Sequence, residues 1–186
     1  MNKNIKKIAV SAMLIALSSV LSEIWIVRMP LGGKLTLLSM LPVMLLVFMF
    51  GRTWGFFSAF VYSLVQLALG FANLMTWGMN ATMWVGAIVF DYILAYTVLG
   101  IAGLFQNKGY TGICIGTTLA LAGRFLCHTI SGTIFFANWS EWSNPFIYSV
   151  CYNGAYMLPE LILTLIAVVI LYKTGAVKRI LSEVNK

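Results

Sequence analysis

The stretch PFIYSVCYNGAYMLPELILTLIAVVILY, residues 145–172, contains a single charged side chain, Glu160. About 20 apolar residues in a helix cross the hydrocarbon core of a bilayer, so this stretch is long enough to span one. Backbone groups exposed to hydrocarbon must be hydrogen-bonded within their own segment. The stretch therefore predicts a transmembrane helix.

Similar apolar runs precede it along most of the chain. Gly, Pro, Asn and Ser residues typical of turns separate these runs, and neither the alternation of β-barrel strands nor a half-length repeat is seen. We therefore predict an all-α integral membrane protein with one domain over residues 1–186 and six transmembrane helices. The expected spans are Ile5–Val27, Leu35–Phe50, Trp54–Leu74, Ala81–Phe105, Tyr110–Phe136 and Pro145–Tyr172.

The composition and the charge distribution support this class. Hydrophobic residues make up 61% of the chain and charged residues 9%, with a mean hydropathy of +0.93, whereas a soluble domain carries about 25% charged residues. If the N-terminus is cytoplasmic, most basic residues fall on the cytoplasmic side, as the positive-inside rule requires. These are Lys3, Lys6, Lys7, Arg52, Lys108, Lys173, Lys178, Arg179 and Lys186, whereas Arg28 and Lys34 fall outside. We therefore expect both termini in the cytoplasm and a multi-pass protein of the cell membrane, with no nucleic-acid partner.

Four ionisable residues fall inside the predicted spans: Asp91, Arg124, His128 and Glu160. Each costs at least about 2.5–3.5 kcal/mol at membrane depth, which makes each a candidate functional residue. His128 and Gly132 are one helical turn apart and could form the wall of a pocket in which the glycine lets a ligand approach the backbone. The alternative for Arg124 is a structural ion pair with Asp91 or Glu160.

Aromatic and amide side chains accompany these residues. Asp91 is followed by Tyr92, and a carboxylate with aromatic walls suits a cationic or amino-bearing heteroaromatic ligand. Tyr148 and Asn153 lie before Glu160 in the last span, and a buried amide needs partners for two donors and an acceptor. Trp139 lies in the preceding loop, where an aromatic belt at the lipid headgroups is the alternative explanation.

Motifs for catalysis are missing from the sequence. It contains no GxxxxGK[ST] phosphate-binding loop, no HExxH or GxSxG motif, and no CxxC pair among its three cysteines. We expect no enzymatic activity, no metal site and no cofactor. Ala12 and Ala16 in the first span have the small-xxx-small spacing that lets a second helix pack closely.

Two segments carry a family resemblance. The sequences GRFLCHTISGTIFF (residues 123–136) and YSVCYNG (residues 148–154) resemble the thiamin-specific S-components, the substrate-binding membrane subunits of energy-coupling factor (ECF) transporters. The run FDYILAYTVLGIAGL (residues 90–104) fits the same family. This resemblance implies a six-helix subunit that binds thiamin near its outer face with high affinity. It also implies docking on an ECF transmembrane coupling protein that carries two ATPase subunits.

The resemblance also implies roles for individual residues. Asp91 stands where the family has an acidic residue that contacts thiamin. Phe136 stands where some members have a stacking tryptophan. The other implied pocket residues are Tyr92, His128, Gly132, Trp139, Tyr148 and Asn153. Ala12 and Ala16 match the surface that meets the coupling protein.

Two other functions remain open. One is an S-component for another vitamin or a pyrimidine precursor. The other is a proton-coupled secondary transporter in which Asp91, Arg124 and Glu160 form the proton relay.

Overall fold

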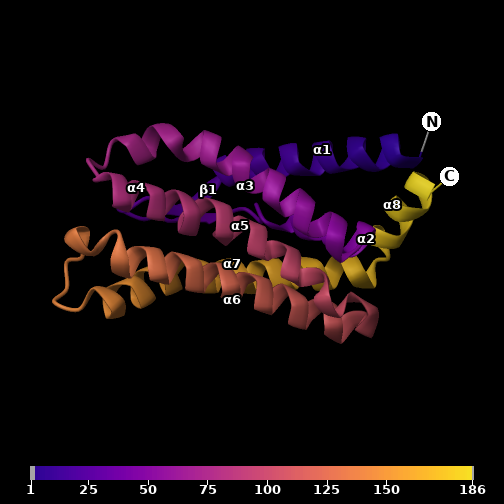
Figure 1. Cartoon of the computed structure of the whole chain (residues 1–186). Helices are drawn as coiled ribbons and strands as arrows, with labels where there is room; N and C mark the ends of the chain where they lie inside the picture. The colour runs from indigo at the N-terminus through magenta and orange to yellow at the C-terminus, as the bar shows by residue number, and fades with distance from the viewer. Residues whose placement is uncertain (1–2, 186) are drawn as a thin grey trace.

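The computed structural model describes residues 3–185, which form a bundle of helices with one short β-hairpin (Figure 1). The hairpin consists of β1 (Trp25–Arg28) and β2 (Lys34–Thr36). The helical elements are α1 (Lys3–Glu23), α2 (Leu41–Phe50), α3 (Arg52–Met75), α4 (Ala81–Ala87), η1 (Ile88–Leu94), α5 (Ala95–Thr97), η2 (Val98–Lys108), α6 (Gly109–Ile134), η3 (Ala137–Trp139), α7 (Pro145–Lys173) and α8 (Ala176–Asn185).

The β-hairpin corrects the predicted end of the first span. The helix ends at Glu23 rather than Val27, and the next residues pair antiparallel with Lys34–Thr36. The run Ile24–Val27 is rich in β-branched and aromatic residues, which favour strands. Gly32, with φ of 89°, supplies the left-handed conformation in the turn.

The second predicted span is also shorter than expected. Residues 34–36 are strand, and α2 contains 10 residues, which rise only about 15 Å. Val43, Met44 and Val47 of α2 are completely buried and form the centre of the core. Four helical stretches of the described chain are long and apolar enough to cross a membrane, so the count of six crossings stays a prediction.

One of these four stretches, Ala81–Ile134, folds back on itself. The chain reverses at Gly109, which has φ of 64°, so that η2 and α6 run side by side in opposite directions (Figure 1). A Cβ on Gly116 would collide with the backbone oxygen of Ala102. Glycine here lets the two helices pack with their backbones in close approach.

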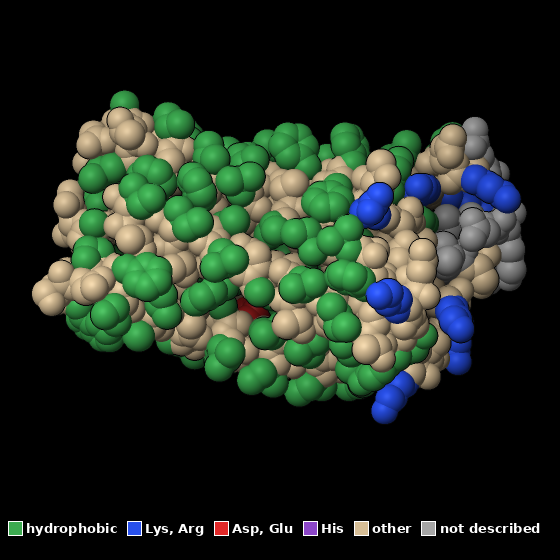
Figure 2. Space-filling view, turned by 60° about the horizontal axis from the view of Figure 1, so that its bottom comes forward, with side chains coloured by type: hydrophobic (Ala, Val, Ile, Leu, Met, Phe, Trp, Pro, Cys, Tyr) green, Lys and Arg blue, Asp and Glu red, His purple; other side chains and the backbone are tan. Residues whose placement is uncertain are grey.

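The surface is apolar and the buried face of α1 is polar, the reverse of a soluble helix. Ser11, Ser18 and Ser22 are buried, and Trp54 and Gln66 of α3 donate to the hydroxyls of Ser11 and Ser22 at 2.9 and 3.0 Å. Figure 2 shows hydrophobic side chains over most of one face, with Lys and Arg gathered at the end where both termini lie in Figure 1. This pattern fits a protein that is surrounded by lipid. Lys186 lies outside the described residues.

Candidate ligand-binding site

A cavity of about 460 Å³ lies between the β-hairpin, α3, η1, α6 and α7. Its volume falls within the range of about 300–1,000 Å³ that is typical of small-molecule sites. Seven of the eight predicted site residues line it: Asp91, Tyr92, His128, Gly132, Phe136, Tyr148 and Asn153. Segments far apart in the sequence therefore meet at one cavity.

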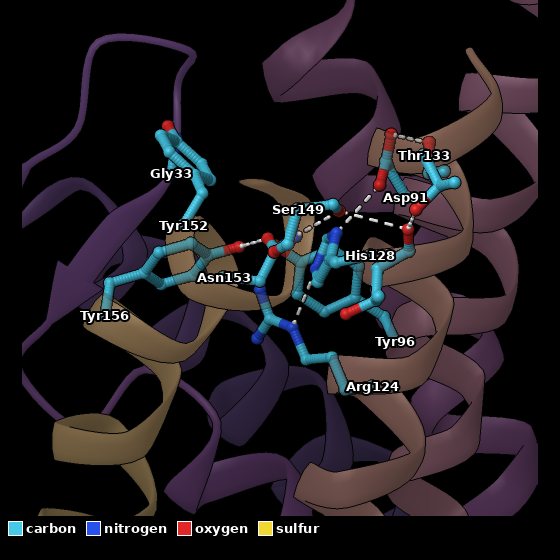
Figure 3. A network of polar contacts seen from close by, with 12 residues as sticks. Gly33, Asp91, Tyr96, Arg124, His128, Thr133, Ser149, Tyr152, Asn153 and Tyr156 are labelled. Carbon is cyan, nitrogen blue, oxygen red and sulfur yellow. Dashed lines mark hydrogen bonds and ion pairs between the residues drawn. The ribbon is translucent and has the colours of Figure 1, made fainter. Parts of the chain in front are cut away.

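Asp91 lies in η1, where the backbone adopts the wider π-helical form. Such segments interrupt an α-helix and are frequent at functional sites. Its Oδ1 lies 2.8 Å from Nδ1 of His128 (Figure 3). Its Oδ2 accepts a hydrogen bond from Ser131 at 2.5 Å. No lysine or arginine pairs with Asp91 in the described part of the chain. The carboxylate is thus held in place from α6 without a lysine or arginine partner.

Arg124 is buried one helical turn below His128 on α6. Its Nε donates to Nε2 of His128 at 3.2 Å, and its Nη2 donates to the hydroxyl of Tyr96, also at 3.2 Å. The guanidinium carbon lies 4.3 Å from the centre of the Tyr96 ring, a cation–π contact. Among the side chains that the structure describes, no carboxylate lies within ion-pair distance of Arg124. The predicted ion pair with Asp91 or Glu160 is therefore wrong.

Glu160 binds the β-hairpin instead. Its side chain is buried on α7 and accepts hydrogen bonds from the backbone amide of Thr36 at 2.8 Å and from the Thr36 hydroxyl at 2.6 Å. The hydroxyl of Tyr152, two turns earlier on α7, accepts from the amides of Leu31 and Gly33. Two side chains of α7 therefore fix the hairpin over the cavity.

Asn153 has partners within α7. Its Nδ2 donates to the Ser149 carbonyl and hydroxyl at 2.9 and 3.1 Å, and its Oδ1 accepts from the Tyr156 hydroxyl at 2.8 Å. A Cβ on Gly132 would collide with the hydroxyl of Ser149. Gly132 lines the cavity, and because it has no side chain it also lets α7 approach α6 closely.

Aromatic rings cover the end of the cavity near the α3–α4 connection. The rings of Trp77, Phe136 and Trp139 lie 5.8–5.9 Å apart from centre to centre. Trp77 and Phe136 line the cavity, whereas Trp139 contacts both rings without lining it. The sequence analysis missed Trp77 and also Trp25 of β1, which lines the cavity too. The position of Trp77, an aromatic residue in the turn after the third predicted span, could have indicated it as a site residue.

The predicted partner-contact residues lie away from the cavity. Ala12 and Ala16 are exposed on α1, beside the large apolar side chains of Met13 and Leu17. Among the described side chains, no group of three His, Cys, Asp or Glu residues is placed to hold a metal ion.

Comparison with known proteins gives matches of three kinds. A family model described as "Thiamine transporter protein" matches residues 8–180. The thiamine transporter ThiT of Bacillus subtilis (strain 168) is 29% identical over 160 residues, in an alignment that covers 79% of each chain. A solved structure of ThiT from Listeria monocytogenes has the same fold, with a TM-score of 0.75 and 19% identity over 97% of this chain and 99% of that chain.

Proposed function

Because this chain belongs to the thiamine transporter protein family, whose members are multi-pass membrane proteins and not enzymes, we propose that it is the high-affinity thiamin-binding subunit of an ATP-driven ECF vitamin uptake transporter. The observation that carries the proposal is the Asp91 carboxylate, which lines an aromatic-walled cavity without a lysine or arginine partner in the described chain.

The buried charges suit a ligand with one positive charge. Among the charged residues that line the cavity, Asp91, Glu160 and Arg124 on η1, α7 and α6 sum to one net negative charge, whereas Glu23, Arg28 and Lys34 in and beside the β-hairpin sum to one net positive charge. Thiamin joins an aminopyrimidine to a cationic thiazolium ring. Binding it beside Asp91 would neutralise the charge of the first group, and a neutral buried site is far less costly than a charged one.

We assign a role to each predicted site residue. Asp91 meets the cationic or polar part of thiamin, while Tyr92, Phe136 and Tyr148 supply aromatic faces for its rings. His128 and Asn153 make hydrogen bonds, and Oδ1 of Asn153 keeps a free lone pair for this purpose. Gly132 keeps α6 and α7 close at the site, and Trp139 supports Trp77 and Phe136.

Transport driven by ATP requires partner proteins, because the sequence has no phosphate-binding loop. We propose an ECF transmembrane coupling protein with two ATPase subunits. Ala12 and Ala16 offer an exposed strip of small side chains on α1 against which a partner helix can pack closely. The basic end of the molecule supports six crossings with both termini in the cytoplasm.

Titration of the detergent-purified chain with thiamin tests the binding proposal. We expect saturable one-to-one binding by calorimetry and fluorescence at nanomolar to low micromolar concentration, and none with riboflavin or a pyridoxine-like ring. D91N should weaken binding by at least about tenfold, or 1.4 kcal/mol, because it removes the negative charge at nearly constant volume. The matched control E141Q neutralises an exposed carboxylate in a loop and should bind like the wild type. Thiamin affinity equal in D91N and the wild type would refute the site, and preference for another vitamin would refute the ligand.

The proton-coupled alternative has less structural support. A relay needs Asp91, Arg124 and Glu160 to be linked, but Glu160 is bonded to Thr36 and lacks a bond to Arg124 in the described chain. Vesicles that contain the chain alone should therefore show no thiamin uptake on a pH gradient. Uptake should require the coupling protein, the ATPases and ATP.

A further inference from the structure

We infer that Arg124 is a positioning residue that keeps His128 neutral, with its proton on Nδ1, and so preserves the negative charge of Asp91 for a cationic ligand. The identity of that ligand as thiamin rests on the proposed function, whereas the state of His128 does not.

The direction of the hydrogen bonds fixes the position of the proton. A guanidinium has donors only, so the 3.2 Å contact from Arg124 Nε requires a lone pair on Nε2 of His128. The remaining proton is then on Nδ1, which donates to Oδ1 of Asp91 at 2.8 Å (Figure 3). Asp91, His128 and Arg124 therefore form one directed chain of hydrogen bonds.

A second proton on His128 is disfavoured in this arrangement. It would point from Nε2 at the N–H of Arg124 and would place two positive charges side by side. Without Arg124, an imidazolium next to Asp91 would be favoured, because opposite charges at hydrogen-bond distance stabilise each other. That imidazolium would neutralise Asp91 and compete with a cationic ligand for its charge.

The surroundings of Arg124 fit this role. Arg124 is 8% exposed, and its guanidinium lies against the Tyr96 ring and Met40, with no carboxylate partner among the described side chains. A buried cation without an ion pair is costly, so its position calls for an explanation. The charged groups around His128 are Asp91 from η1 and Arg124 from α6. On α7 the cavity is lined by neutral Asn153 and tyrosines and by Glu160, which is bonded to Thr36.

Nitrogen-15 NMR on the chain without ligand tests the inference directly, because the sequence has one histidine and every imidazole signal belongs to His128. At neutral pH we expect a protonated, pyrrole-type Nδ1 and an unprotonated, pyridine-type Nε2. R124M removes the donors and the charge with a side chain of similar length, and should shift His128 to the imidazolium form. R124K keeps a donating cation and should retain the neutral form. An imidazolium or a protonated Nε2 in the wild type would overturn the inference without any variant, and so would identical spectra for R124M and the wild type.

The pH dependence of thiamin binding separates this role from a purely structural one. In R124M the affinity should fall by about tenfold from about pH 8 to about pH 6, as His128 gains a proton that ligand binding must remove. The wild type and R124K should change little over the same range and also control for titration of thiamin itself. If R124M binds thiamin more weakly than the wild type by the same factor at both pH values, Arg124 has a purely structural role and the inference is refuted. Failure of the wild type to bind thiamin would refute the proposed function, while the NMR result would still decide the role of Arg124.

Discussion

Replacement of Glu160 by Gln should release the β-hairpin from α7. The Glu160 carboxylate accepts two hydrogen bonds from Thr36, one from its amide and one from its hydroxyl, in a site where Glu160 is 2% exposed. A carboxamide has one oxygen, so E160Q can accept from only one of these donors while its NH₂ group faces the other.

The size of the effect follows from these contacts. A hydrogen bond to a charged group contributes about 1.5–3 kcal/mol, and a buried donor left without a partner costs about 1–3 kcal/mol. Since Thr36 can partly relax toward Ser39, 2.6 Å away between the two hydroxyls, we expect a net loss of about 2–4 kcal/mol in the free energy that docks the hairpin. At 1.4 kcal/mol per factor of ten, the open population should rise by roughly thirtyfold to several hundredfold.

Hydrogen–deuterium exchange with mass spectrometry measures this opening. Peptides that cover residues 24–39 should exchange faster in E160Q, because their amides exchange when the hairpin undocks, while peptides from α6 should be unchanged. E141Q is the control for the loss of one negative charge at an exposed site. Equal exchange of the hairpin in E160Q and the wild type would refute the reasoning. Faster exchange of every helix would show that Glu160 stabilises the whole bundle instead.

Three further predictions follow from the cavity and the packing. Gly116→Ala should lower the unfolding free energy by about 1–3 kcal/mol, because its Cβ would collide with the backbone of η2. Gly154→Ala, which has open space around the added Cβ, should be neutral or stabilising by up to about 1 kcal/mol, and thermal unfolding in detergent compares the two. Tyr152→Phe removes the acceptor for two backbone amides of the β1–β2 loop and should weaken thiamin binding by roughly tenfold in a fluorescence titration; unchanged affinity would show that the loop does not shape the site. Trp77→Phe should remove more of the thiamin-induced quenching than Trp139→Phe, because Trp77 alone of the two lines the cavity.

The membrane class and most helices could be predicted from the sequence, because long apolar runs have few alternatives in lipid. The β-hairpin could not. The run Ile24–Val27 is uniformly apolar, and such a run has no periodicity that distinguishes a strand from the end of a helix. Its partner strand and the loop between the strands are held by Glu160 and Tyr152, which lie more than a hundred residues later in the sequence.

The sequence indicated which residues line the cavity better than it indicated the contacts between them. Costly polar residues and the family resemblance pointed to Asp91, His128 and Asn153, which all line the cavity. The pairing of Asp91 with His128 depends on the register between η1 and α6. The π-helical turn at Asp91 changes that register, and nothing in the local sequence indicates it. For the same reason, the sequence could not show that no carboxylate among the described side chains lies beside Arg124.

The reversal at Gly109 has a consequence for biosynthesis. Residues of η2 meet residues of α6 that are close in sequence, as where Gly112 faces the backbone of Phe105 and Gly123 faces Val98. Contacts of such low sequence separation form early, before the chain has to close long loops. The helices η2 and α6 can therefore enter the bilayer together as a packed helical pair while α7 is still being synthesised. The ligand cavity, which needs α7 for Tyr148, Asn153 and Glu160, is completed last, so a nascent chain that stalls after Ile134 would be inserted and packed but unable to hold its vitamin.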